Sequence, residues 1–396
     1  MSQHVREIPS LKIKFIDGTP CETSTYNLIL PHLDSDFKNK NETYVAVSCF
    51  PPFMKRDEDN IIFDYIKDNI VDDKTKIIFD NSYEGHILSC LPGIHKIIDE
   101  VKLDSLNCYF LSGGVQAQEI YNQWCIDNQI DNKINIIVIN SWERHIHQSI
   151  HAEKDFEFNI KNKEKLFLCF NRILRKHRVS LLGLLYNKNL VERAFYSFFK
   201  LSYGGKFSPL GLTPYLKLTK NTQSVIHRNI FKNMMNFPLL LNNKTGENTN
   251  SILSSDAELY DASYFSLVTE TFFFKEENQT FDEVSVFFSE KIFKPIACKH
   301  PFILVSRPKS LFHLRHLGYK TFHPYIDESY DLMEDDEERL LAIVNEVERL
   351  SKKTTEEWIE WQTTIKDIVE HNFSVIKNKT NTDSYVIKEK NEIRRY

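Results

Sequence analysis

The sequence predicts an α/β protein with two parallel-sheet domains followed by C-terminal helices. Three observations lead to this prediction. The chain has 396 residues, more than the roughly 100–200 residues of one domain. Short, continuous apolar runs alternate with polar, helix-like stretches in both halves of the chain, a pattern typical of Rossmann-like domains. Towards the C-terminal end the apolar residues change to the spacing of amphipathic helices.

The first half of the chain contains four apolar runs with the character of buried strands. They are Tyr44–Cys49, Lys76–Phe79, Leu106–Leu111 and Ile134–Ile139. Continuous runs rich in β-branched residues are typical of parallel strands that helices cover on both faces. Val115–Asp127, between the last two runs, has the composition of such a helix. Ligands of these sheets bind at the carboxyl ends of the strands, so the residues after each run are the candidates for function.

A polar stretch, His151–Lys165, separates this domain from a second α/β pattern. We place the boundary near residue 155, which gives two Rossmann-like domains over residues 1–155 and 156–396. Strands of the second domain are predicted at Leu166–Phe170, Tyr264–Val268 and Pro301–Val305. Residues from about 204 to 260 are irregular and rich in Asn, Ser and Thr, which predicts loops and short helices.

Two helices are predicted at the C-terminal end. Apolar residues between Leu340 and Leu350 keep helical spacing. They follow the acidic segment Glu334–Glu338, which suits a helix N-terminus. Trp358 and Val369 belong to a second helix that begins at about Thr355.

Composition excludes several classes of protein. Apolar residues make up 41% of the chain and charged residues 27%, so the chain is not mainly disordered. The net charge of −5 lacks the basic excess that drives binding to nucleic acid or anionic membranes. Seven cysteines without a CxxC pair favour reduced thiols over a zinc site or disulfides. With no apolar signal core and no apolar run of about 20 residues, we expect a cytoplasmic protein without a transmembrane segment.

The densest group of candidate functional residues is the pair Glu290-Lys291, which opens an amphipathic stretch and is followed by the apolar run His300–Val305. This pattern resembles the donor-binding element of the α1,3-fucosyltransferases, in which a Glu-Lys pair opens a helix and a proline-containing strand follows. The block from Tyr264 to Asp331 also resembles phage and bacterial proteins assigned as glycosyltransferases. Two Rossmann-like halves with terminal helices are the GT-B architecture of such enzymes.

The resemblance implies roles for both members of the pair. Lys291 would contact the diphosphate of a nucleotide sugar, and Glu290 would accept hydrogen bonds from the ribose hydroxyls. The chemistry agrees, because a cation at a helix N-terminus stabilises a diphosphate leaving group. Read alone, the pair is equally an exposed ion pair at a helix start. The following strand reads HPFILV where the family has VPV, which leaves the sugar and the nucleotide base open.

A second group of polar residues directly follows the strand Leu166–Phe170. It comprises Asn171, Arg172, Arg175, Lys176, His177 and Arg178. Guanidinium groups contact phosphates bidentately, so cations at a strand's carboxyl end favour a diphosphate site. The fucosyltransferases also have an Arg after the first strand of this domain, and we select Asn171, Arg172 and Arg178 as donor-binding residues. A nucleic-acid patch is the rival interpretation, but interleaved aromatic residues are missing.

Three residues of the first half are candidate bases. An inverting transferase needs one group that deprotonates the acceptor hydroxyl. Glu84 and His86 follow the strand Lys76–Phe79, where the fucosyltransferases also place a Glu, and both are proposed as catalytic. Glu143 follows the next-but-one strand and stays open as a third candidate. An ordinary loop carboxylate is the alternative in each case.

Three further motifs are weaker. Ser112-Gly113-Gly114 permits close approach of a ligand to the backbone, but a tight turn is the simpler interpretation. Asp34-Ser35-Asp36 matches the metal-binding DxD of another glycosyltransferase class, a triplet that arises often by chance. The acidic and aromatic segment Tyr325–Asp331 either lines a donor pocket or packs on the core.

Together these observations predict an inverting, metal-independent glycosyltransferase that takes a sugar from a nucleotide-sugar donor, without a further cofactor. Residues 1–155 would bind the acceptor, a glycan or other hydroxyl-bearing molecule, and residues 156–396 the nucleotide sugar. Two alternatives stay open. One is a non-catalytic nucleotide- or glycan-binding module, and the other is a transferase acting on modified DNA, which the acidic net charge disfavours.

Overall fold

The computed structural model describes residues 75–85, 88–150, 156–171, 174–198, 221–233, 239, 257–274 and 285–379, together with 5–8, 13–16, 44–48 and 66–68. They form two compact α/β units, each built on a mainly parallel sheet, which confirms the predicted fold class. The chain passes from the first unit to the second between Arg144 and His145, inside helix α5 (Ser141–Ile150). The predicted boundary near residue 155 lies beside residues 151–155, outside the described part.

The sheet of the first unit has the strand order β1-β2-β3-β4-β5-β6. Its strands are β1 (Val5–Ile8), β2 (Ile13–Ile16), β3 (Tyr44–Ser48), β4 (Lys76–Asn81), β5 (Cys108–Ser112) and β6 (Asn135–Val138). The β1–β2 pair is antiparallel and the other neighbours are parallel. All parallel strands therefore end at one edge, where the polar residues after β4, β5 and β6 gather.

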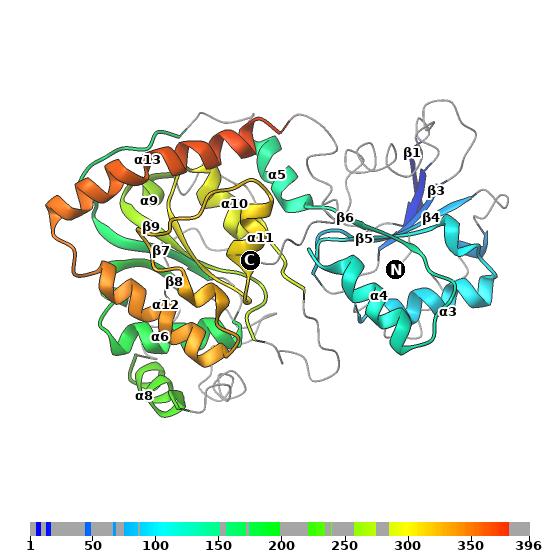
Figure 1. Cartoon of the computed structure of the whole chain (residues 1–396), viewed down its shortest axis with the longest axis horizontal. Helices are drawn as coiled ribbons and strands as arrows, with labels where there is room; N and C mark the ends of the chain where they lie inside the picture. Colours follow the sequence, from blue (N-terminus) through cyan, green and yellow to red (C-terminus); the bar gives the residue numbers. More distant parts are fainter. Residues whose placement is uncertain are drawn as a thin grey trace. The chain divides into compact units, whose positions relative to one another are not determined.

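Helices α3 (Leu91–Val101) and α4 (Ala117–Asp127) cover one face of this sheet (Figure 1). Helix α3 has a proline in its first turn, and its C-cap Lys102 adopts the left-handed conformation, as helix termini commonly do. The Tyr121 hydroxyl accepts from the backbone N–H of Ile134 at 2.8 Å and lies 3.1 Å from His95 Nε2. These bonds tie both helices to the start of β6 within an apolar core.

The second unit contains a parallel sheet with the strand order β10-β9-β7-β8. Its strands are β7 (Lys165–Asn171), β8 (Ala194–Phe198), β9 (Ser263–Thr269) and β10 (Phe302–Val305). Every residue of β9 and β10 is buried, as expected for parallel strands covered on both faces, although β10 lies at the edge of the described sheet.

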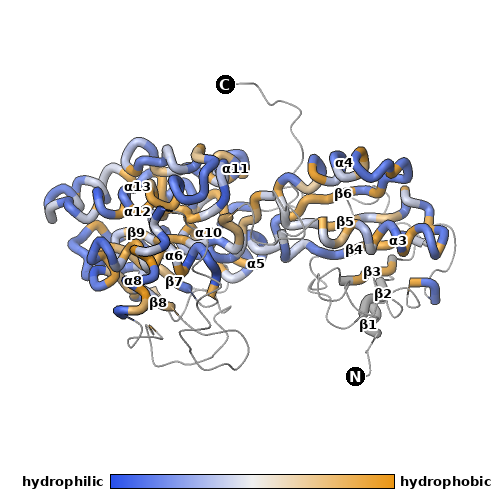
Figure 2. Tube along the Cα trace, turned by 90° about the horizontal axis from the view of Figure 1, so that it is seen from below, coloured by the Kyte–Doolittle hydropathy of each residue, from blue (hydrophilic) through white to orange (hydrophobic). Residues whose placement is uncertain are grey.

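Helices pack on both faces of this second sheet (Figure 1). One side carries α9 (Ala257–Asp261), α10 (Glu290–Ala297) and α13 (Thr355–Lys377), and the other side carries α6 (Lys176–Asn187) and α12 (Asp336–Leu350). The unit also contains α8 (Gln223–Asn233), which contacts α6, and the short α11 (Ser310–His316). Figure 2 shows hydrophobic residues along the strands, whereas hydrophobic and hydrophilic residues alternate along α12 and α13. Both predicted C-terminal helices are confirmed, and α13 begins with a capping box in which Thr354 and Glu357 satisfy each other's backbone N–H groups.

A short segment, 285–288, is part of the first unit although it follows β9 in the chain. The Val115 N–H donates to the Val286 carbonyl at 2.9 Å, and the Val286 N–H donates to the Gln116 side chain at 2.9 Å. The next residue, Ser289, caps α10 of the second unit.

Candidate functional site

The carboxyl ends of β7 and β9 are joined through the side chain of Asn171. Its Nδ2 lies 3.2 Å from the Tyr196 hydroxyl and 3.2 Å from Cys169 Sγ, and its Oδ1 accepts from Thr269 Oγ1 at 2.6 Å. Asn171 is buried. The side chain therefore fixes two neighbouring strands at the edge where ligands bind in such sheets.

Arg178 lies in the first turn of α6 and is 2% exposed. Its Nη2 donates to the carbonyls of Thr269 at 3.1 Å and Glu270 at 3.3 Å. Burial lowers the pKa of Arg178 to about 10, and neighbouring Arg175 acts in the same direction; the group still carries its charge at neutral pH. Arg178 thus places a buried positive charge at the end of β9, where its guanidinium donates to two backbone carbonyls.

Glu270 occupies the first position after β9 and is completely buried. Its carboxylate accepts from the Ser289 hydroxyl at 2.5 Å, from the Ser289 N–H at 3.2 Å and from the Thr271 N–H at 3.2 Å. Burial raises the pKa of Glu270, while the Lys291 ammonium and the Ser289 hydrogen bond act against this rise. Glu270 was not among the functional residues predicted from the sequence, although its place two residues after a predicted strand was a sufficient signal.

The pair Glu290-Lys291 opens α10, as predicted, with Ser289 as its N-cap. Lys291 Nζ donates to Ser289 Oγ at 3.0 Å and to a carboxylate oxygen of Glu290 at 3.0 Å. The Lys291 side chain is 28% exposed and that of Glu290 18%. Burial raises the pKa of Glu290, but the attraction and hydrogen bond of Lys291, the Lys294 charge and a backbone hydrogen bond together hold this pKa below its usual value. Both groups are charged at neutral pH and accessible to a ligand.

The structure thus links four of the predicted donor-binding residues, Asn171, Arg178, Glu290 and Lys291, through Thr269, Glu270 and Ser289. Arg172 and the candidate base His86 lie outside the described residues. Arg175 and Lys176 are half-buried at the start of α6. The chemistry available at this edge is the recognition of an anion by an ammonium group and a helix N-terminus, with a carboxylate beside it to accept hydroxyl hydrogens.

The carboxyl edge of the first unit holds the candidate bases Glu84 and Glu143. Glu84 is half-buried, and its backbone carbonyl accepts from the Gly113 N–H at 3.2 Å. Glu143 lies in the first turn of α5 and is completely buried, and its N–H donates to Asn140 Oδ1 at 3.2 Å. Of these two carboxylates, Glu84 is the accessible one.

The glycine turn after β5 is closed by protein atoms. A Cβ atom on Gly113 would lie 2.8 Å from the Ser82 carbonyl oxygen and 2.7 Å from a ring carbon of Phe287. The close approach that a glycine allows is therefore used within the fold, as the tight-turn interpretation predicts.

The segment Tyr325–Asp331 packs on the core of the second unit. The Asp331 carboxylate accepts from the N–H groups of Leu311 and Phe312 at the start of α11, at 2.9 and 3.1 Å. Glu328 accepts from Thr321 Oγ1 at 2.7 Å and from the Phe322 N–H at 2.6 Å. These acidic residues are structural. Asp34-Ser35-Asp36 lies outside the described residues.

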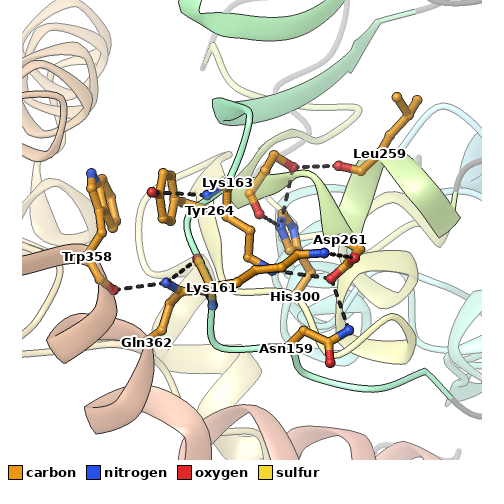
Figure 3. Close-up of polar contacts among 10 residues, drawn as sticks. Asn159, Lys161, Lys163, Leu259, Asp261, Tyr264, His300, Trp358 and Gln362 are labelled. Carbon is orange, nitrogen blue, oxygen red and sulfur yellow. Dashed lines mark hydrogen bonds and ion pairs between the residues drawn. The ribbon is translucent and has the colours of Figure 1, made fainter. Parts of the chain in front are cut away.

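A separate polar cluster lies at the opposite, amino edge of the second sheet (Figure 3). Asp261 accepts from Asn159, Lys161 and Lys163, which alternate along one extended segment. Gln362 of α13 exchanges two hydrogen bonds with the Lys161 backbone. The cluster fastens the segment that leads into β7.

Among the residues that the structure describes, no helix is long and apolar enough to cross a membrane. In the same part of the chain, no three His, Cys, Asp or Glu side chains gather as metal ligands would.

Comparison with known proteins gave no match to a family model and no match among curated proteins. Among solved structures, the chain is similar to α,α-trehalose 6-phosphate synthase from Burkholderia multivorans. The identity is 11% and the TM-score 0.43, over 87% of this chain and 69% of that chain.

Proposed function

We propose that the protein is a glycosyltransferase that binds a nucleotide-sugar donor at the carboxyl edge of its second sheet. The observation that carries this proposal is the accessible Lys291 ammonium at the N-terminus of α10, 3.0 Å from the Glu290 carboxylate. A sugar nucleotide presents both a diphosphate and a ribose diol. An ammonium group with helix N–H groups suits the diphosphate, and a neighbouring carboxylate suits the diol.

The buried residues of the site act indirectly. Arg178 and Asn171 contact the ends of β7 and β9, so we assign them to holding the edge in shape and to adding positive charge behind it. Arg172 stays a proposed phosphate ligand. The similarity to the fucosyltransferases in the Glu-Lys pattern supports this division between ribose and phosphate, whereas the identity of the sugar is left to experiment.

The reaction proposed is an inverting displacement. The acceptor oxygen forms a bond to the anomeric carbon while the bond from that carbon to the diphosphate oxygen breaks. The acceptor proton passes to a base, for which we propose Glu84, with His86 as the second candidate. The diphosphate leaves with its negative charge stabilised by Lys291 and the helix N-terminus. We further propose that no metal ion takes part.

A turnover assay tests this proposal. The protein is incubated with GDP-, UDP-, CMP-, ADP- and dTDP-linked sugars and a panel of glycan acceptors, and the release of free nucleotide is followed with and without EDTA. Release from one donor, unaffected by EDTA and lost in Lys291→Ala, would support the proposal. Nucleotide binding without release would instead favour a non-catalytic binding module. Tight, strongly salt-dependent binding to DNA would favour a transferase or binding protein for nucleic acid.

A further inference from the structure

The Ser289 hydroxyl has one hydrogen to donate and two lone pairs that can accept. Its hydrogen goes to the Glu270 carboxylate at 2.5 Å, because an ionised carboxylate can only accept. The lone pairs then receive the Lys291 N–H at 3.3 Å and the Lys291 ammonium at 3.0 Å. Glu270 thus determines the orientation of the Ser289 hydroxyl.

The negative charge of Glu270 also attracts the Lys291 ammonium. Electrostatic attraction to Lys291 is the largest effect that opposes burial in the pKa of Glu270. Such interactions are reciprocal, so the carboxylate stabilises the ammonium to the same extent. Lys291 therefore interacts electrostatically with two carboxylates, the partly exposed Glu290 and the buried Glu270.

A carboxylate in this buried position lowers the stability of the fold. Burial of an ionised group is unfavourable unless it is paired and hydrogen-bonded. Both oxygens of this carboxylate accept, Oε1 from the Ser289 N–H and Oε2 from the Ser289 hydroxyl and the Thr271 N–H. A glutamine has one acceptor oxygen and an amide group that donates, so it could not keep all three hydrogen bonds. Replacing the carboxylate therefore disturbs the orientation of Ser289 and removes the negative charge near Lys291.

We propose that Glu270 is a positioning residue of the donor site, which holds Ser289 as an acceptor and so keeps the Lys291 ammonium in place for the donor diphosphate. The identity of the ligand rests on the proposed function. The effect of Glu270 on Lys291 rests on the described geometry. Glu270 itself is completely buried and touches no ligand.

The test compares Glu270→Gln with Glu328→Gln. Glu328 is a well-matched control because its carboxylate also accepts from one hydroxyl and one backbone N–H in the same unit. Affinity for GDP and UDP is measured by titration calorimetry. The reactivity of Lys291 is measured by limited acetylation with acetic anhydride and peptide mass spectrometry, without any nucleotide.

For Glu270→Gln we expect affinity to fall about tenfold, and Lys291 acetylation to rise by a similar factor, because the Lys291 side chain loses the Ser289 acceptor that holds it. Glu328→Gln should change neither value. In a Lys291→Ala background, Glu270→Gln should cause no further loss of affinity. Ser289→Ala, which removes the connecting hydroxyl and keeps the carboxylate, should weaken binding to a similar degree.

The outcomes separate this inference from the proposed function. If the wild-type protein binds no nucleotide but Glu270→Gln still raises acetylation of Lys291 alone, the donor site is wrong and the positioning effect stands. If the wild-type protein binds a nucleoside diphosphate and Glu270→Gln changes neither affinity nor acetylation, Glu270 is merely structural and the inference is overturned.

Discussion

The Ser289 hydroxyl donates to the Glu270 carboxylate at 2.5 Å, although 18 residues separate them in the chain. This bond joins the carboxyl end of β9 to the N-terminus of α10. His177 of α6 donates from Nε2 to the Glu270 carbonyl at 3.0 Å, so α6 is also hydrogen-bonded to this residue. The residues proposed to bind a donor are therefore held by one connected set of buried polar groups, which favours a preorganised site.

The accessible carboxylate of the first unit should be the one needed for turnover. Glu84→Gln removes a half-buried acid without changing its size. We expect the rate of sugar transfer to fall by about 10²–10⁴, with the affinity for nucleotide unchanged. Glu143→Gln, which alters the completely buried carboxylate at the start of α5, should retain transfer in the folded fraction. Loss of transfer in Glu143→Gln with full activity in Glu84→Gln would move the base to Glu143.

Gly113 should tolerate no side chain. In Gly113→Ala the new Cβ would lie within 3.0 Å of the Ser82 and Glu84 carbonyl oxygens and of the Phe287 ring. Backbone atoms cannot move aside cheaply, so we expect a loss of about 1–3 kcal/mol in the free energy of unfolding, measured in urea. Unchanged stability would mean that the turn after β5 is more open than described.

The amino-edge cluster of the second unit should depend on Asp261. Lys163 is 5% exposed at its side chain and pairs with Asp261 at 3.3 Å, whereas Lys161 is 49% exposed. Asp261→Ala leaves a buried ammonium without its carboxylate, and we expect a loss of about 2 kcal/mol. Lys161→Ala should cost less than about 1 kcal/mol because that pair faces solvent. Equal effects of both variants in urea unfolding would contradict this assignment.

His300 should make the protein sensitive to acid. Its Nε2 donates to the Ser263 carbonyl at 2.9 Å, and its Nδ1 lies 2.8 Å from the Ser266 hydroxyl. Burial lowers the pKa of His300 to about 3, against 6.5 for an ordinary histidine. Between these values the unfolded chain binds a proton that the folded chain does not, so stability falls as the pH drops through this window.

The measurement is urea unfolding of the wild-type protein and His300→Gln at pH 7, 5.5 and 4.5. The variant should be less stable at pH 7, but its stability should decline less steeply, by up to about 1.4 kcal/mol per pH unit. His371→Gln, at a site near the surface on α13, should retain the wild-type slope. Parallel pH profiles for His300→Gln and the wild-type protein would show that another group causes the acid sensitivity.

Much of the fold could be predicted from continuous apolar runs. The described strands β3, β4, β5, β6, β7, β9 and β10 coincide with predicted runs to within two residues at each end. Strand β5 begins at Cys108 instead of Leu106, because Ser105–Asn107 forms a 3-10 turn capped by the Asp104 side chain. Strand β8 was missed, although its sequence AFYSF is an apolar run broken by one serine, like the run predicted for β9.

The candidate site was predictable in position more than in orientation. The rule that ligands bind at strand ends selected Asn171 and Arg178, and the resemblance to the fucosyltransferases selected Lys291. The structure places all three on one hydrogen-bonded set. The strand-end rule could not indicate that Arg178 would be buried against backbone carbonyls, because this burial depends on how α6 packs on β9. Glu270 was missed because a search for phosphate ligands favours cations over carboxylates.

A thermal-shift panel with GDP, UDP, CMP, ADP and dTDP tests the central claim most directly. A ligand that binds only the folded state raises stability by about 2.7 kcal/mol at a hundredfold excess over Kd. We predict that one diphosphate stabilises the protein and Lys366→Ala, which removes an exposed lysine of α13, but does not stabilise Lys291→Ala. Equal stabilisation of Lys291→Ala and the wild-type protein, or no stabilisation by any nucleotide, would contradict a donor site at the start of α10.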